Sequence, residues 1–191
     1  NTVVLTIDAA LQRVTQTALQ QRIEEIRKMN SSYGGTDAQG ASAVVVNVKT
    51  GEILAMASYP SYDLSTYYQN FGATSADPLK PLTNRSTMGQ YSVGSSFKLV
   101  VALGAADQEI ITRSTTVNCT GVYTYFQGYS PKCGGVHGST NVIKALQVSC
   151  NTFFYEIGRR LTIEGIDKYA SALGFAQATG IEIPEKTGTL S

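Results

Sequence analysis

Charge, histidine and cysteine are all scarce in this 191-residue sequence. Charged residues make up 15% of it and the net charge is +1 at pH 7, so no basic stripe argues for a nucleic-acid partner. No apolar run reaches the ~18 residues needed to cross a bilayer, and neither internal repeats nor a signal-peptide pattern is present. With 42% hydrophobic residues, the sequence can still bury a core, which predicts one globular domain or most of one.

The order of apolar patterns predicts a mixed α+β fold. Apolar residues recur at helical spacing over 9–28, and a polar loop follows to Gly40. Two valine-rich and alanine-rich runs, 43–48 and 53–58, predict an antiparallel β-hairpin. The sequence predicts an irregular segment over 59–90, a turn-rich stretch over 112–140, and helices that resume near Asn141 and Thr162.

Ser95 and Lys98 form the first candidate catalytic pair. They lie three residues apart at the head of an apolar run, 99–103, and on a helix such residues share one face. A lysine whose pKa is lowered by burial can take the proton of a serine hydroxyl, which activates the serine without histidine. Gly94 allows a tight entry turn, and a helix N-terminus offers backbone N–H groups to an oxyanion.

A second candidate element is the triplet Ser149-Cys150-Asn151, where a hydroxyl and an amide can relay a proton and hold a substrate amide. A purely structural interpretation exists for both elements. Ser95 could be a helix cap with Lys98 in solvent, and Ser149 and Asn151 could be residues of a helix-terminal turn.

The two elements, S-x-x-K and then S-x-N, resemble the penicillin-recognising serine acyl-transferases, the penicillin-binding proteins and serine β-lactamases. The flanks resemble the transpeptidase domain of penicillin-binding proteins in particular, and a β-lactamase would not be expected to share them. These flanks are residues 6–12, 43–60, 84–85, 173–175 and 179–184. One departure is Val93 before Gly94, where the family often has proline, and it concerns loop rigidity rather than chemistry.

The family's third element, K-T-G on a strand, has a literal match at Lys186-Thr187-Gly188. Pro184 stands directly before it, and proline interrupts a strand ladder. We therefore interpret this match as a coincidental surface turn. The expectation is that residues 1–191 are the N-terminal portion of a single transpeptidase domain, with an incomplete antiparallel sheet and the true third motif beyond Ser191.

The resemblance implies a D,D-transpeptidase that cross-links peptidoglycan stem peptides ending in D-Ala-D-Ala and is acylated by β-lactams. It assigns Ser95 as nucleophile, Lys98 as base, Ser149 as proton relay and Asn151 as substrate-orienting amide. It implies no catalytic cofactor, a membrane anchor upstream, a cell-wall synthesis complex, and a place on the extracytoplasmic face of the bacterial membrane. The alternatives are a non-enzymatic β-lactam sensor, a D,D-carboxypeptidase or β-lactamase that uses water, and a purely structural cell-wall domain.

The cysteines leave three interpretations open. Cys119, Cys133, His137 and Cys150 lie within one stretch that ends inside the S-x-N triplet, and they form a ligand set suited to structural zinc. A Cys119–Cys133 disulfide fits an oxidising compartment. Three free thiols beside an ordinary histidine are the third interpretation.

Overall fold

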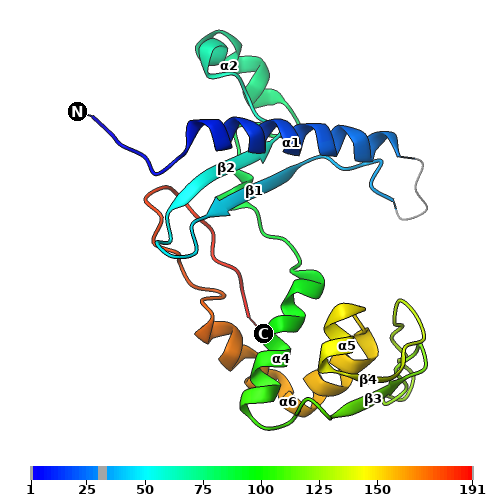
Figure 1. Cartoon of the computed structure of the whole chain (residues 1–191). Coiled ribbons are helices and arrows are strands. Elements are labelled where there is room, and N and C mark those ends of the chain that lie inside the picture. Colours follow the sequence, from blue (N-terminus) through cyan, green and yellow to red (C-terminus); the bar gives the residue numbers. More distant parts are fainter. Residues whose placement is uncertain (1, 30–33, 191) are drawn as a thin grey trace. The chain divides into compact units, whose positions relative to one another are not determined.

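The computed structural model of the chain describes residues 2–29 and 34–190 (Figure 1). Contacts divide the chain into two units, one comprising the residues up to Gly89 together with 183–186, the other comprising 90–182 together with the residues from Thr187 onward. Helices combine with two short antiparallel sheets, which confirms the mixed α and β prediction.

The first unit is built on helix α1 (Ala9–Lys28), which packs against the hairpin of β1 (Ala41–Val46) and β2 (Ile53–Tyr59) (Figure 1). Asp8 caps α1 by accepting the Leu11 N–H at 2.8 Å. Gln12 fixes the helix on β2, because its amide accepts the Met56 N–H and donates to the Met56 carbonyl, both at 2.7 Å. The predicted helix over 9–28 is confirmed.

The hairpin was predicted at 43–48 and 53–58, and its first strand lies two residues earlier. Val46 pairs with Ile53 as the last rung, and Asn47 then starts the turn by accepting the Lys49 N–H on its side chain. Val48, which continues the apolar run, therefore lies in the turn and is 95% exposed. The part of the predicted loop at residues 31–33 lies outside the described residues.

The prediction of an irregular segment over 59–90 was wrong in two places. Helix α2 (Tyr67–Ala76) follows the 3₁₀ turn η1 (Leu64–Thr66), and the short helix α3 (Arg85–Met88) begins after Asn84, whose side chain accepts the Ser86 N–H. No residue of α2 is buried. A helix that buries no face needs no apolar stripe, and the sequence therefore shows no helical pattern here.

In the second unit helix α4 (Lys98–Asp107) packs against α6 (Asn151–Ala172), and a small hairpin contacts α5 (Val142–Gln147) and α6. The 3₁₀ turn η2 (Gly94–Phe97) leads directly into α4. Strands β3 (Thr116–Cys119) and β4 (Gly138–Asn141) pair in antiparallel register within the stretch predicted as turns, so that prediction missed them. Helices α5 and α6 follow, and α6 breaks at Thr162, near the predicted second start.

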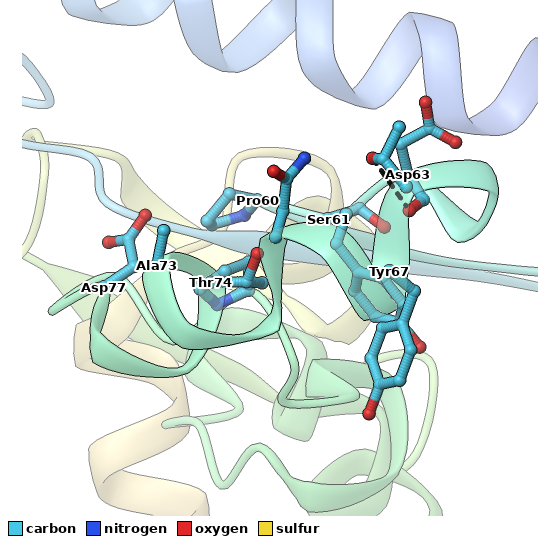
Figure 2. A pocket seen from close by; sticks show the side chains of 11 residues that line it. Pro60, Ser61, Asp63, Tyr67, Ala73, Thr74 and Asp77 are labelled. Carbon is cyan, nitrogen blue, oxygen red and sulfur yellow. Dashed lines mark hydrogen bonds between the residues drawn. The ribbon is translucent and has the colours of Figure 1, made fainter.

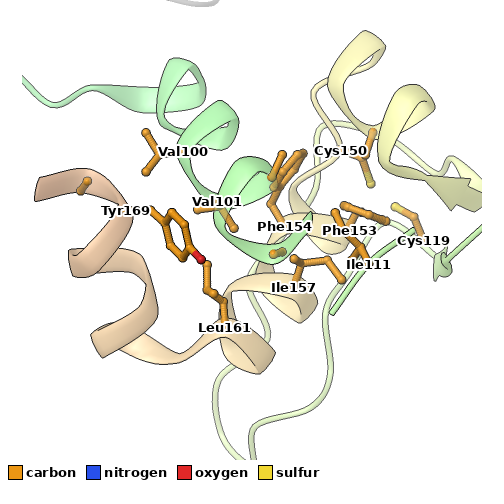
Figure 3. Packing of buried hydrophobic residues seen from close by; sticks show 14 residues of the cluster. Val100, Val101, Ile111, Cys119, Cys150, Phe153, Phe154, Ile157, Leu161 and Tyr169 are labelled. Atoms are coloured by element: carbon orange, nitrogen blue, oxygen red, sulfur yellow. The ribbon is translucent and has the colours of Figure 1, made fainter. Parts of the chain in front are cut away.

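The core of this unit lies between α4 and α6 (Figure 3). Buried Val100, Val101 and Ala105 of α4 face an apolar row on α6 that includes Phe153 and Ile157. Gly104 lets the two helices approach closely, since a Cβ atom there would lie 2.5 Å from Cδ2 of Tyr169. The apolar run after Lys98 therefore anchors η2 and the start of α4 on α6.

Residues 183–190 form neither helix nor strand, and Lys186, Thr187 and Gly188 are all exposed. Among the described residues, no helix has the length and apolar character to cross a membrane.

Candidate active site

Ser95 lies in the turn η2, and Lys98 is the first residue of α4. Gly94 has a φ of +60°, a left-handed conformation in which a side chain would be strained. This turn presents Ser95 to solvent while Lys98 is partly covered, and the Lys98 Nζ lies 3.1 Å from the Ser95 Oγ. The i, i+3 spacing therefore produces the contact that the sequence predicts.

The second motif meets the first at Lys98. The Lys98 Nζ donates to the Ser149 carbonyl oxygen at 2.8 Å and to the Asn151 Oδ1 at 2.6 Å, and it lies 2.8 Å from the Ser149 Oγ. The Ser149 hydroxyl in turn donates to the Ser95 Oγ at 2.9 Å. All four residues predicted as catalytic thus lie in one hydrogen-bonded group, although the two motifs are more than fifty residues apart in the chain.

A neutral amine at Lys98 can make the two bonds to acceptors that cannot donate. A carbonyl oxygen and an amide oxygen can only accept, so they take two N–H groups of Lys98. An amine with two N–H groups so engaged keeps its lone pair for a hydroxyl proton of Ser95 or Ser149. Burial lowers the pKa of Lys98, which favours this form, while nearby thiolate charge from Cys133 raises it.

Ser149 adopts a backbone conformation that disfavours side chains. Its φ is +53° in the connection between α5 and α6, a left-handed value that most often belongs to glycine. Such strain persists only where the surroundings impose it, and here the Ser149 N–H donates to the Leu146 carbonyl while that of Cys150 donates to Ala145. The bend lets Ser149 and Asn151 both contact Lys98 although Cys150 stands between them.

Asn151 begins α6 and is held at two further points. Its side-chain Nδ2 donates to the Lys132 carbonyl at 3.3 Å, and its backbone N–H donates to the Cys133 Sγ at 3.2 Å. Sequence reasoning missed Lys132, because a residue that acts through its backbone carbonyl leaves no side-chain pattern. It also missed the buried Phe154, whose ring centroid lies 5.7 Å from the Lys98 Nζ.

The structure brings all four predicted metal-ligating residues together. Cys119 at the end of β3, Cys133, His137 and Cys150 place their ligand atoms within 4.8 Å of one another. The Nδ1 of His137 lies 3.5 Å from the sulfurs of Cys119 and Cys133, and the sulfurs of Cys133 and Cys150 are 3.9 Å apart. Tetrahedral zinc with Zn–S of about 2.3 Å and Zn–N of about 2.0 Å requires ligand separations of roughly 3.5 to 3.8 Å. The three separations given above, 3.5, 3.5 and 3.9 Å, are close to this range, and the upper bound of 4.8 Å for the whole set is wider, so the group is a possible metal site.

The electrostatics of the cluster favour a thiolate at Cys133. Burial by itself raises the pKa of this thiol, but the backbone N–H groups of Thr152, Gly135 and Asn151 outweigh burial and lower the pKa to about 6. Burial raises the pKa of Cys150 to about 12. All three cysteines are free in the structure, so the Cys119–Cys133 disulfide is not formed.

A pocket of about 380 Å³ in the first unit contains none of the predicted site residues (Figure 2). Side chains of α2 and of the segment that follows β2 line it. Its carboxylates act as local caps, since Asp63 accepts the backbone N–H and the hydroxyl of Ser65 and Asp77 accepts the Leu79 N–H. The pocket therefore does not extend the candidate site.

Comparison with known proteins agrees with this arrangement. The family model described as "Penicillin binding protein transpeptidase domain" matches residues 41–190. Peptidoglycan D,D-transpeptidase MrdA of Escherichia coli (strain K12) is 32% identical over 154 residues, which are 76% of this chain and 24% of the relative. Stage V sporulation protein D of Bacillus subtilis (strain 168) is 30% identical over 189 residues, which are 97% of this chain and 27% of the relative.

A solved structure of a peptidoglycan synthase complex contains a chain of the same fold. It superposes with a TM-score of 0.85 at 31% identity and covers 99% of this chain and 34% of that chain. The present chain thus spans about a quarter of the length of the curated relatives that it matches. With most of its length matched by the family model, and with the S-x-x-K and S-x-N residues in one hydrogen-bonded group, the chain belongs to the penicillin-binding protein transpeptidase family.

Proposed function

We propose that the chain is the nucleophile-bearing N-terminal portion of a D,D-transpeptidase domain that cross-links peptidoglycan stem peptides. The observation that supports this most directly is the position of the Lys98 Nζ, 3.1 Å from the Ser95 Oγ and 2.8 Å from the Ser149 Oγ. One amine thus lies within proton-transfer distance of both a nucleophile and a relay hydroxyl.

In the acylation step, the Ser95 Oγ attacks the carbonyl carbon between the two terminal D-alanines, and Lys98 accepts the hydroxyl proton. The C–N bond then breaks, and Ser149 passes the proton to the departing D-alanine amine, with Lys98 restoring the proton of Ser149. An amine of a neighbouring stem peptide then attacks the ester carbonyl carbon and gives a proton to Lys98. The C–O bond to Ser95 breaks, and Lys98 returns the proton to the Ser95 oxygen. The Asn151 amide, held by Lys98 and Lys132, orients the substrate peptide.

The proposal leaves two functions to a strand beyond Ser191, in keeping with the predicted third motif. These are recognition of the substrate carboxylate and the second oxyanion donor, the first donor being the Ser95 backbone N–H. The exposed, non-strand conformation of Lys186-Thr187-Gly188 supports this assignment. Loss of one oxyanion donor lowers a rate by about 10²- to 10³-fold, so residues 1–191 alone should be acylated at least that much more slowly than an extended protein. Equal rates would identify Lys186-Thr187-Gly188 as the working motif.

Covalent labelling with a fluorescent penicillin tests the nucleophile. A protein extended past Ser191 should be labelled, Ser95→Ala should abolish the label, and Ser96→Ala should keep it. Ser96 is a matched control, because it lies in the same turn but its hydroxyl donates to the Val93 carbonyl. Labelling of Ser95→Ala at another serine would refute the assignment.

A separate measurement, on the longest natural form of the chain, shows whether an amine or water accepts the acyl group from Ser95. With a stem-peptide donor and an amine acceptor, a transpeptidase forms a cross-linked product. A carboxypeptidase or β-lactamase instead hydrolyses the acyl-enzyme, and a sensor domain stays acylated.

We further place the protein on the extracytoplasmic face of the bacterial membrane, anchored and within a cell-wall synthesis complex, since its relatives are named for peptidoglycan synthesis.

We also propose that Cys119, Cys133, His137 and Cys150 hold one structural zinc ion. The three-sulfur, one-nitrogen donor set and its separations support this. The ion would supply no catalytic chemistry. These residues would clamp the loop that carries Cys133 and His137 onto the start of α6.

Elemental analysis should find about one zinc per chain, and a strong chelator should lower the melting temperature. Cys133→Ser should melt lower even with zinc supplied. Metal-free protein with three titratable thiols and unchanged melting after chelation would refute the zinc site, and a single titratable thiol in denaturant would indicate the disulfide instead.

A further inference from the structure

Glu156, on the second turn of α6, is the centre of a charged network that the proposed chemistry does not use. Its carboxylate accepts the Tyr123 hydroxyl at 2.6 Å, Arg159 at 2.8 and 3.1 Å, and Arg160 at 2.6 Å. The Glu156 side chain is 13% exposed, whereas those of Arg159 and Arg160 are 32% and 41% exposed, so the carboxylate is covered and its cationic partners face solvent. The side-chain hydrogen bond from Arg159, opposed by burial, keeps the pKa of Glu156 low, at about 2.

The network attaches a loop to α6. Residues 121–133, here termed the tyrosine loop, leave the end of β3 and return to Cys133. Tyr123 of this loop donates to Glu156, and the guanidinium of Arg159 lies 4.1 Å from the ring centroid of Tyr125. Two tyrosines near one end of the loop are thereby fixed to one turn of the helix.

The two halves of the tyrosine loop are joined by backbone hydrogen bonds. The Tyr123 N–H donates to the Pro131 carbonyl and the Cys133 N–H donates to the Gly121 carbonyl, both at 2.9 Å, and Val122 pairs with Lys132 as an antiparallel bridge. The half that carries Tyr123 therefore sets the position of Lys132.

Lys132 and Lys98 contact opposite ends of the Asn151 side-chain amide. Its carbonyl oxygen can only accept, so it selects the NH₂ end of the amide, and the Oδ1 end then faces the Lys98 Nζ at 2.6 Å. Glu156 is thus linked to Asn151 in three steps. Tyr123 donates its hydroxyl to Glu156 and its backbone N–H to Pro131, and the carbonyl of the next residue, Lys132, accepts the Asn151 amide.

We infer that Glu156 and Tyr123 are positioning residues that act through the Lys132 carbonyl to orient the Asn151 amide toward Lys98. As far as it concerns catalysis, the inference rests on the proposed acylation of Ser95. Tyr123→Phe is the sharpest test, because it keeps the ring and removes only the hydroxyl bonded to Glu156. Misplacing a substrate-orienting group by about 1 Å costs up to about 10²-fold in rate, so Tyr123→Phe should slow acylation by a fluorescent penicillin by about 10- to 100-fold. Tyr68→Phe, on a side chain that is 91% exposed, is the matched control and should leave the rate unchanged.

A double-mutant cycle separates positioning from a general loss of structure. In an Asn151→Ala background, adding Tyr123→Phe should slow acylation by less than about 2-fold, because the group it positions is already gone. A full 10- to 100-fold further loss would overturn the inference. Glu156→Gln provides a second variant in case Tyr123→Phe fails to fold. It should slow acylation less than Tyr123→Phe does, since the glutamine oxygen still accepts a hydrogen bond from Tyr123.

A spectroscopic readout keeps this test independent of catalysis. In a ¹⁵N–¹H correlation spectrum, the side-chain NH₂ resonances of Asn151, assigned by their disappearance in Asn151→Ala, should move in Tyr123→Phe and stay in Tyr68→Phe. Unmoved resonances in Tyr123→Phe would refute the positioning role. If the resonances move but the parent protein is not acylated at Ser95, the proposed function fails while the positioning role stands.

Discussion

Ser149 offers a test in which stability and activity should separate. At its φ of +53°, a left-handed residue other than glycine costs about 1–2 kcal/mol, and alanine carries that strain as serine does. Glycine removes the strain, but it also gives the unfolded chain more conformational entropy, which lowers the free energy of unfolding by about 0.4–1 kcal/mol. Both variants lose the same hydroxyl, so their difference isolates the backbone. Ser149→Gly should therefore be more stable than Ser149→Ala by about 0.5–1 kcal/mol, the reverse of the usual order.

Thermal unfolding at fixed pH measures this difference. For a domain of this size, 1 kcal/mol corresponds to about 2–4 °C, so Ser149→Gly should melt about 1–4 °C above Ser149→Ala. Acylation by a fluorescent penicillin should fall in both by about 10²- to 10⁴-fold, because the hydroxyl that relays the proton is absent. A higher melting temperature for Ser149→Ala would show that the left-handed backbone carries no strain, and undiminished acylation in both would remove Ser149 from the mechanism.

Two further predictions concern Lys98 and the α4–α6 contact. Because burial lowers the pKa of Lys98 and only the neutral amine accepts a proton, the acylation rate should rise with pH and level off below pH 10.5, the ordinary value; a rate that falls over this range would contradict the role of Lys98 as base. Gly104→Ala should lower the free energy of unfolding by about 1–3 kcal/mol in urea titrations, since its Cβ would overlap the buried Tyr169 ring. Gly72→Ala is the control, because a Cβ at this position of α2 would have nothing within 4 Å. It should raise the free energy of unfolding by up to about 1 kcal/mol, and equal effects of the two substitutions would refute the packing argument.

Local spacing alone predicted only the contacts between residues that are close in the sequence. Ser95 and Lys98 meet because i and i+3 share a helix face, and Cys133 and His137 meet through a turn. The meeting of Ser149 with Lys98 followed from family resemblance alone, since no local rule joins residues so far apart. Strands β3 and β4 were missed because four-residue strands of mostly polar residues, such as Gly138–Asn141, carry too little alternation to identify. Lys132 was missed because its contribution is a backbone carbonyl.

The middle residue of the S-x-N triplet explains why the candidate metal cluster lies where it does. Ser149 and Asn151 contact Lys98, whereas Cys150 is fully buried and its sulfur lies 3.9 Å from that of Cys133. Cys133 in turn accepts the Asn151 backbone N–H, the first N–H of α6 and one that the helix itself cannot satisfy. A thiolate at this helix N-terminus is stabilised by the same N–H groups that it fixes in place, which accounts for its lowered pKa. The cluster and the catalytic group therefore share one peptide segment, and a change in the sulfur ligands should alter the geometry at Lys98 without any contact with substrate.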